Sequence, residues 1–398
     1  MSKLIAFCTI FLVIAGIFTA IFFISVPKSL KIMKAGIVEA GQKNGIIIEI
    51  RNSRAKFPNK IEFSDIQISD FSQNFNATIK SCRIDFYFGG YIRAVLRRIT
   101  MGETIHLQNF SQIAILQGID LKIAENQIFT KAQGNIFFET QKYEITANNF
   151  NDFGFEIKNF SACGELIDSA LISINSNFQI PDNGEIDING FLFFDSLLIF
   201  QNPEIEIRGI EIGNLFPDLN VSGTLAAEIT PYADEFTLNA EFLQNIKNIE
   251  ASASVSINNF RDSGNRFTKQ ILSALAFVGI NSLDFANVSA DIKYSPSKIV
   301  INDFMADNFR FAILADGRFY PKSSEYRFSA GIRFSPAMRS IIERGIWEAM
   351  TPDIPQNEGR FLGASVSGKG ENISISFDDQ TFRRGINTLL SSIRDIFR

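Results

Sequence analysis

The 398-residue chain has little of the side-chain chemistry on which most enzymes depend. Its one histidine, His106, stands between the apolar residues Ile105 and Leu107, which argues against multi-histidine metal sites and histidine-based triads. Cys-x-x-Cys pairs, a phosphate-binding loop and a dinucleotide fingerprint are all missing. The 43 acidic residues leave a carboxylate-based hydrolase open, but no pair of them stands out by position. We therefore expect no enzymatic activity, no catalytic residue, no metal and no cofactor.

Runs of basic residues are missing too. The chain has 38 Lys and Arg against 43 Asp and Glu, a net charge of −5, and no Lys/Arg run exceeds two residues. Because a nucleic-acid-binding protein needs a basic stripe to neutralise phosphates, we expect no nucleic-acid partner. Of the three cysteines, Cys82 and Cys163 lie beyond the N-terminal apolar segment; they could pair, but their spacing matches no disulfide framework. The cysteines therefore do not show whether the protein lies in an oxidising or a reducing compartment.

Charge is absent from residues 4–26, the longest apolar run in the chain. A helix of that length covers roughly 34 Å, enough to cross the roughly 30 Å hydrocarbon layer of a bilayer. A cleaved signal peptide is the alternative, but its apolar region normally spans only about 7–15 residues. The small residues suited to cleavage, near Thr19 and Ala20, also lie inside the run. We interpret the segment as a retained membrane anchor.

The charges beside this segment leave its orientation open. Lys28, Lys31 and Lys34 follow it, whereas Lys3 precedes it. The positive-inside rule then favours a cytoplasmic position for the rest of the chain. A first helix with a short head and a long folded domain behind it often inserts with that domain translocated, so the flanking lysines do not decide the topology.

From residue 45 onward, apolar and polar residues alternate with period two, which is typical of strands with one apolar and one polar face. Between 249 and 257, Ile, Ala and Val occupy the odd positions, and Glu and Ser the even ones. One-sided strands of this kind form antiparallel sheets. The pattern predicts strands at 45–50, 61–68, 77–88, 103–108, 113–124, 127–138, 142–150, 153–160, 170–178, 185–200, 204–212, 219–230, 235–243, 248–258, 283–294, 298–304, 309–319, 325–334, 360–367 and 371–377.

At Gly209 the alternation slips by one residue. Ile205 and Ile207 are in one phase, and Ile210 and Ile212 are in the other. A slip would turn every later side chain to the opposite face unless a β-bulge absorbs the extra residue, and glycine suits a bulge. We therefore predict a β-bulge at Gly209.

Three segments have the spacing of short amphipathic helices: 265–279, 336–350 and 381–397. Gly279 is expected to end the first, and Pro336 to begin the second. The third could cap the end of a sheet or lie in a membrane interface. Its apolar residues are candidates for membrane contact: Phe382, Ile386, Leu389, Leu390, Ile393 and Phe397.

The order of elements from Ile271 to Phe377 resembles the C-terminal region of the AsmA family of membrane-anchored bacterial envelope proteins. A helix ending at Gly279 leads to LDFANVSADI (283–292), then to IVINDF (299–304), a strand closing with DGRF (316–319) and finally ASVSG (364–368). The family has the same order of elements, and an N-terminal helix before a long β region also matches. Residues 45–260 share only the alternation.

The resemblance implies a mainly β fold: one N-terminal transmembrane helix followed by an elongated, curved antiparallel sheet, or β-groove, with a few short amphipathic helices. It further implies a single-pass protein of the inner (cytoplasmic) membrane with the bulk of the chain in the periplasm. The expected domains are an anchor and flank at 1–34, a β-meander or groove at 35–260, an AsmA-like region at 261–380 and a C-terminal amphipathic helix at 381–398.

The function that the resemblance implies is handling or transport of phospholipid between membranes, or regulation of outer-membrane assembly. Phospholipid or another acyl lipid, the inner membrane and other envelope proteins are the expected partners. A one-faced sheet must cover its apolar face with another layer or with a ligand. The alternative function is a membrane-tethered β-rich scaffold that binds another envelope protein through a sheet edge, without lipid cargo. Candidate groove residues are Ile249, Ala251, Val255, Ile257, Leu283, Phe285, Phe309, Phe311 and Ile313.

Overall fold

The computed structural model describes residues 30–377, except for 32, 44, 57–58, 71–74, 103–109, 124–125, 149–156, 168–170, 181–183, 196, 217–219, 263, 265–268, 270–271, 274, 353–358 and 371. The predicted anchor at 4–26, His106 and the predicted C-terminal helix at 381–397 lie outside these residues. Within the described part of the chain, no helix combines the length and apolar character needed to cross a bilayer.

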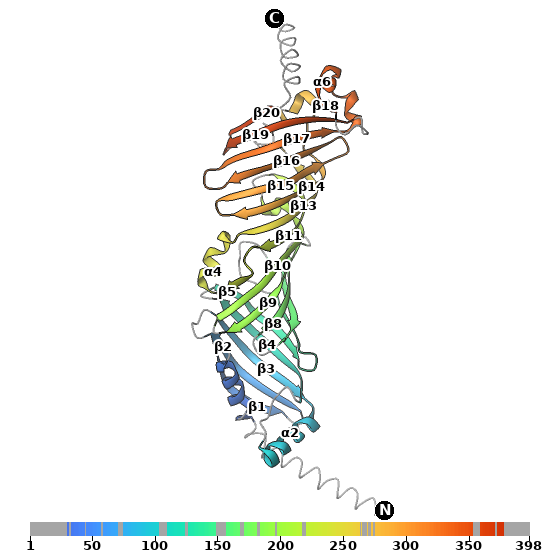
Figure 1. The fold of residues 1–398 in the computed structure, drawn as a ribbon. Helices are drawn as coiled ribbons and strands as arrows, with labels where there is room; N and C mark the ends of the chain where they lie inside the picture. Colours follow the sequence, from blue (N-terminus) through green and yellow to red (C-terminus); the bar gives the residue numbers. More distant parts are fainter. Residues whose placement is uncertain are drawn as a thin grey trace, which may run out of the picture. The chain divides into compact units, whose positions relative to one another are not determined.

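The described chain is mainly β, with few helices, and its strands pair antiparallel, as predicted. Figure 1 shows the succession of strands. They are β1 (Ile46–Lys56), β2 (Lys60–Asp70), β3 (Phe75–Phe86), β4 (Ser111–Ile123), β5 (Asn126–Phe137), β6 (Lys142–Ala147), β7 (Asn159–Glu165), β8 (Leu171–Ile180), β9 (Gly184–Asp195), β10 (Leu197–Glu211), β11 (Val221–Pro231), β12 (Glu235–Thr237), β13 (Ala251–Asp262), β14 (Phe285–Ser295), β15 (Lys298–Asp307), β16 (Phe311–Tyr320), β17 (Glu325–Phe334), β18 (Thr351–Pro352), β19 (Arg360–Lys369) and β20 (Asn372–Phe377).

The helices of the described chain are short. Besides helical residues at 30–31, 33–43, 269, 272–273 and 275, they are α2 (Phe88–Met101), α3 (Ile212–Leu215), α4 (Ala240–Asn245), η4 (Ile246–Asn248), η5 (Ala276–Val278), η6 (Pro336–Ser340) and α6 (Arg344–Ala349). The helix predicted at 336–350 is therefore two pieces, η6 and α6. Gly279 caps η5 with a φ of 77°, the left-handed conformation that glycine adopts without strain, so the predicted stop is confirmed.

Three strand predictions fail in identifiable ways. The strand predicted at 185–200 is divided between β9, which ends at Asp195, and β10, which begins at Leu197 and continues to Glu211. The strand predicted at 235–243 ends at Thr237 and gives way to α4, because the side chain of Asn239 accepts a hydrogen bond of 2.8 Å from the backbone N–H of Phe242 and caps a helix. The strand predicted at 248–258 begins only at Ala251. The strand predicted at 103–108 lies outside the described residues. Neither α2 nor the helical segment at 33–43 was predicted.

The predicted bulge at Gly209 is confirmed. The register of β10 against β11 shifts between Ile207 and Ile210, and Gly209 has a φ of 69°. Ile207 lies opposite Ala227, and Ile210 opposite Leu225. Because the bulge absorbs one residue, both isoleucines stay in phase with apolar partners on β11.

The described chain divides into two compact units. Unit 1 comprises the residues up to Gln179 together with Ile188–Pro203 and Glu235–Gln244. Unit 2 comprises Ile180–Asp187, Glu204–Asp234 and the residues from Asn245 onward. Each unit has its own buried apolar cluster. In unit 1 that cluster joins Leu30 and Met33, from the start of the chain, to Phe63, Phe86 and other side chains of β1–β5.

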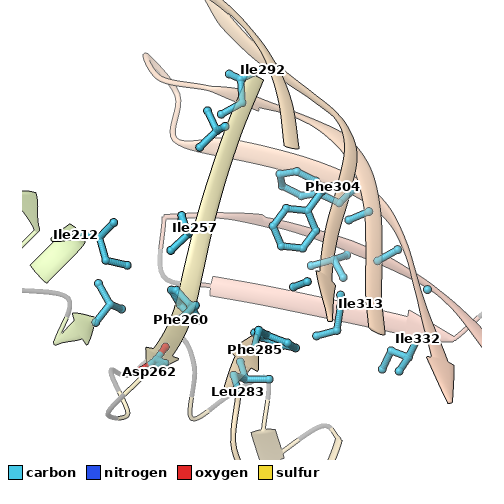
Figure 2. Close-up of a pocket in the computed structure, with 18 of the residues that line it drawn as sticks. Ile212, Ile257, Phe260, Asp262, Leu283, Phe285, Ile292, Phe304, Ile313 and Ile332 are labelled. Carbon is cyan, nitrogen blue, oxygen red and sulfur yellow. The ribbon is translucent and has the colours of Figure 1, made fainter. Parts of the chain in front are cut away.

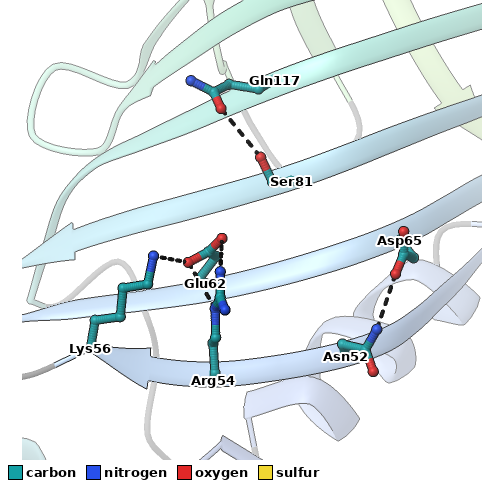
Figure 3. Close-up of polar contacts among 7 residues, drawn as sticks. All are labelled: Asn52, Arg54, Lys56, Glu62, Asp65, Ser81 and Gln117. Atoms are coloured by element: carbon teal, nitrogen blue, oxygen red, sulfur yellow. Dashed lines mark hydrogen bonds and ion pairs between the residues drawn. The ribbon is translucent and has the colours of Figure 1, made fainter.

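The opposite face of the unit 1 sheet is polar (Figure 3). Arg54 donates two hydrogen bonds to Glu62, at 3.0 and 2.8 Å, and the Nζ of Lys56 lies 2.6 Å from the same carboxylate. Hydrogen bonds from Arg54 and then Lys56 lower the pKa of Glu62 to about 2. The side chains of Arg54 and Lys56 are largely exposed, and exposed ion pairs contribute little to stability. The folding of unit 1 therefore depends mainly on its apolar cluster.

Candidate apolar binding pocket

Unit 2 contains a sheet with one apolar face. Its strands pair in the order β10, β11, β13, β14, β15, β16, β17, β19 and β20. Since side chains alternate between the two faces of a strand, apolar residues directly opposite one another form rows across the sheet. Two such rows meet at the register shift between β14 and β15: one carries Ile207, Ala227, Val255 and Ala290 on β10–β14, and the other carries Phe304, Ala315, Ala330, Ala364 and Phe377 on β15–β20.

One end of this apolar face is covered by the chain itself. Met338 on η6, Ile342 in the following turn and Trp347 on α6 are each less than 5 % exposed. They pack in one cluster with the strand residues Phe334 and Leu362. Phe285 and Phe311 belong to the same cluster, with their rings edge to face at a centroid distance of 5.7 Å. Here the sheet has a conventional two-layer core.

The rest of the face lines a pocket of about 750 Å³. Its lining includes Ile207 on β10, Val255 and Ile257 on β13, Ala330 on β17 and Ile375 on β20, so it extends across nine strands. In Figure 2, Ile292 lies at one end of the pocket, and Leu283, Phe285 and Asp262 lie at the other. All of the lining residues belong to unit 2.

Small side chains keep the pocket open. Alanine occupies six of the lining positions on its sheet, at 227, 253, 306, 315, 330 and 364. Each lies opposite apolar residues on the neighbouring strands, where a larger side chain would fill the space. The covering helices supply bulky residues such as Met338 and Trp347, whereas six positions on this part of the sheet carry only a methyl group. The sequence thus builds a filled core at one end and an unfilled space beside it.

The pocket offers almost no polar chemistry. Among the described residues that line it, Asp262 is the one that carries a charge, and the others are apolar residues and Gly331. The carboxylate of Asp262 accepts a hydrogen bond of 2.7 Å from the backbone N–H of Gly264 at the end of β13. The described chain contains no group of three or more His, Cys, Asp or Glu residues that could hold a metal ion. A ligand in this pocket would therefore be held by hydrophobic contact and not by hydrogen bonds or charge.

The structure brings together five of the nine candidate groove residues. Val255, Ile257, Leu283, Phe285 and Ile313 all line the pocket. Two others do not line the pocket: Ile249 is half-buried just before β13, and Ala251 is the first residue of β13.

Phe309 and Phe311 are separated from the pocket for different reasons. Phe309 lies in the turn before β16 and is 78 % exposed, with the guanidinium of Arg310 5.0 Å from its ring centroid. Phe311 is buried in the covered cluster. The six candidates for membrane contact between Phe382 and Phe397 lie outside the described residues.

Sequence reasoning missed the contribution of β17, β19 and β20. Phe328 and Ala330 on β17, Val366 on β19, and Ile373 and Ile375 on β20 line the pocket although none was a candidate. These residues could have been identified from the sequence, because they show the same apolar–polar alternation from which Val255 and Ile257 were chosen as candidates. The two cysteines that could have paired are both free, Cys82 buried on β3 and Cys163 exposed on β7.

Comparison with known proteins adds no identity to this geometry. No family model matches the chain, and no match is found among curated proteins or among solved structures. The pocket of unit 2 therefore has to be interpreted from its own residues.

Proposed function

We propose that the protein is an AsmA-like, membrane-anchored envelope protein whose unit 2 binds the acyl chains of phospholipid or of another acyl lipid. The observation that carries the proposal is the pocket of about 750 Å³, lined by apolar residues from nine strands and flanked by a filled core. This volume lies within the range of about 300–1,000 Å³ that is typical of small-molecule sites.

The lining chemistry supports hydrocarbon as the ligand. Each methylene that leaves water for an apolar surface contributes about 0.8 kcal/mol. A polar ligand would lose its hydrogen bonds to water in this pocket without regaining them, since the lining offers backbone already paired in strands and a single carboxylate. The acyl part of a lipid therefore fits the pocket, and the headgroup stays outside it.

The apolar segment at 4–26 supports a membrane setting for this ligand. A protein anchored in the inner membrane, with its bulk in the periplasm, would have lipid within reach and could pass acyl chains to a partner or to a second membrane. Handling or transport of lipid between membranes, or regulation of outer-membrane assembly through it, is the biological role that we propose.

Site-specific photocrosslinking tests the proposal in cells. A benzophenone amino acid replaces Ile257, which lines the pocket, or Ser256, its exposed neighbour on the other face of β13. We expect a lipid adduct, identified by mass spectrometry, at position 257 and not at position 256. If position 257 gives no lipid adduct under conditions in which the protein is folded, the lipid proposal fails. A protein adduct at either position would instead favour the scaffold without lipid cargo.

A further inference from the structure

Three hairpin turns of unit 2 follow one another along one side of its sheet (Figure 1). They join β14 to β15, β16 to β17 and β19 to β20. The backbone N–H of Gly370 donates a hydrogen bond of 2.8 Å to the carbonyl of Ser324, and the hydroxyl of Tyr326 donates one of 3.0 Å to the carbonyl of Asn372. These bonds hold the second and third turns together. We call this side of the sheet the hairpin rim, which comprises residues 293–298, 318–327, 367–370 and 372.

The hairpin rim is basic. Its described residues include six that are positively charged: Lys293, Lys298, Arg318, Lys322, Arg327 and Lys369. Glu325 is the acidic residue among them, and its carboxylate lies 3.6 Å from the Nζ of Lys369 in an exposed ion pair. Glu371 follows in the sequence but lies outside the described residues. Even with both glutamates counted, the positive charges exceed the negative ones by four.

Three of these charges form a row on the polar face of the sheet. Lys293 lies opposite Val300, which in turn lies opposite Arg318. Arg318 lies directly opposite Arg327, and all three basic side chains are exposed. In the part of the chain that the structure describes, none of the three forms an ion pair. Because like charges that face each other across two strands destabilise a sheet, an anionic partner would relieve the repulsion between the two arginines.

The acidic residues of β14 and β16 lie further from the turns. Asp291 and Asp316 are each two residues inward from a basic residue of the row, and the carboxylate of Asp316 accepts a hydrogen bond of 2.8 Å from the backbone N–H of Asp303. Just before β13, beside the rim, Lys247 and Glu250 add one charge of each sign. Positive charge is thus concentrated at the rim, so an anionic surface would contact the rim rather than the flat face of the sheet.

The other face of the hairpin rim is aromatic and apolar. Directly paired residues form a row there, which consists of Tyr294, Ile299, Phe319 and Tyr326. The first three are half-buried, and Tyr326 is buried. Tyrosine is enriched where proteins meet the headgroup layer of a membrane. Basic residues on one face and aromatic or apolar residues on the other are typical of segments that lie in a membrane interface.

The pocket of unit 2 extends to this rim. Its lining residues Ile292, Phe328 and Ile373 lie beside the aromatic row and are half-buried. At the other end of the pocket, Leu275 is 4 % exposed and Leu283 is 8 % exposed. The pocket is therefore more exposed at the hairpin rim than at its covered end.

We propose that the hairpin rim docks on an anionic lipid bilayer and that acyl chains pass between this bilayer and the pocket of unit 2 at the rim. The passage of acyl chains rests on the proposed function, whereas the docking rests on the two rows of the rim. An anionic surface follows from charge complementarity. A bilayer, and not an acidic protein, follows from the aromatic row and from the apolar pocket directly behind it.

Tryptophan quenching by brominated lipid tests the docking with the full-length protein held in nanodiscs of zwitterionic lipid. Tyr320→Trp places a reporter on the rim, and the native Trp347, which is 3 % exposed in the covered core, supplies a shielded background. Vesicles of brominated phosphatidylglycerol should quench the reporter, and vesicles of brominated phosphatidylcholine should not. Each basic residue near an anionic surface contributes about fivefold, so Arg318→Gln/Arg327→Gln should weaken vesicle binding about 25-fold.

A matched control removes two other exposed arginines of unit 2. Arg310→Gln/Arg339→Gln, in the turn before β16 and on η6, removes the same charge at the other end of the strands and should leave the quenching unchanged. Circular dichroism shows whether each variant is folded, and Ser297→Trp, on the exposed turn before β15, replaces the reporter if Tyr320→Trp does not fold. An unquenched reporter in the folded protein, an equal loss in the control, or equal quenching by phosphatidylcholine overturns the docking.

A benzophenone at position 257 measures lipid uptake separately from docking. In these experiments only the vesicles contain phosphatidylglycerol, so an adduct with it reports passage from the vesicle. We expect its yield to fall with Arg318→Gln/Arg327→Gln; weakened docking with an unchanged yield overturns passage at the rim. Quenching at the rim without any lipid adduct at position 257 supports the docking but overturns the passage and the proposed function. A lipid adduct without quenching overturns the docking and leaves the proposed function intact.

Discussion

Replacing Val255 with glutamate should empty the pocket of unit 2 without unfolding it. Val255 is half-buried on β13, lines the pocket, and lies between Ala227 on β11 and Ala290 on β14. Because both neighbours are alanines, the longer side chain fits without overpacking and its carboxylate reaches the open space. The loss of a half-buried valine should lower the free energy of unfolding by about 1 kcal/mol.

The effect on lipid binding should be larger than the effect on stability. An acyl chain that crosses β13 can cover the carboxylate, which costs several kcal/mol in lost hydration, or it can avoid this position. Avoiding it gives up contact over about one strand spacing of roughly 4.8 Å, or about four methylenes, worth about 3 kcal/mol. The acyl chain takes the alternative with the smaller loss of binding free energy, about 3 kcal/mol, so the affinity for lipid should fall by about two orders of magnitude.

The assay compares phospholipid retained per protein after affinity purification in detergent and the Kd for a fluorescent acyl lipid in the same detergent. Ser256→Glu is the matched control, because it adds the same charge to the exposed face of the same strand. It should bind lipid like the parent protein. If Val255→Glu also binds lipid like the parent while its thermal unfolding shows an intact unit 2, the acyl chain does not lie on β13 and the reasoning is refuted.

Three further predictions concern single positions elsewhere. Burial raises the pKa of Cys82 to about 11, so at pH 8 only about one thiol in a thousand is ionised, and maleimide should label the exposed Cys163 far faster than Cys82 in the native protein, as read by peptide mass spectrometry. The pKa of Glu62 is about 2 in the folded protein, against an ordinary value of 4.5. The stabilising contribution of the ionised Glu62 is therefore present above pH 4.5 and is lost as the pH falls from about 4.5 to about 2. Glu62→Gln should flatten the pH dependence of thermal unfolding in that window, and an unchanged profile would contradict the ion pairs assigned to Glu62. At the bulge, Gly209→Val should lower the free energy of unfolding by about 1–3 kcal/mol, whereas Gly209→Asn should cost less because asparagine tolerates positive φ; equal losses in denaturant titrations would show that φ is not the constraint.

The strands of unit 2 could be predicted because their signal is local. A strand with one buried face must alternate apolar and polar residues, so β17 begins and ends at the predicted residues 325 and 334. The slip at Gly209 was likewise visible, since a one-residue change of phase has few structural explanations other than a bulge. Local sequence failed where a helix follows a strand directly. Asn239 caps α4, and an asparagine at the N-cap favours a helix more strongly than the apolar–polar alternation of residues 235–237 favours a longer strand.

The boundary between core and pocket could not be predicted from alternation. Phe309, Phe311 and Ile313 have the same phase in the sequence, yet one is in a turn, one is in the covered core and one lines the pocket. What separates them is distant chain: η6 and α6, which follow β17, cover Phe311, and β16 begins only after Phe309. Periodicity identifies the apolar face, but its cover is a tertiary property.

The contrast between the two ends of that face is the strongest structural argument for a ligand. Where unit 2 closes its own core, it uses large side chains such as Met338 and Trp347. Beside that core, alanines such as Ala330 and Ala364 hold a space of about 750 Å³ open. Soluble proteins rarely leave large contiguous apolar surfaces in water, because filling the space with larger side chains would stabilise the fold. Retaining the open space therefore lowers the stability of the empty protein. A hydrocarbon ligand that binds in this space only when the protein is folded would raise the stability again by mass action.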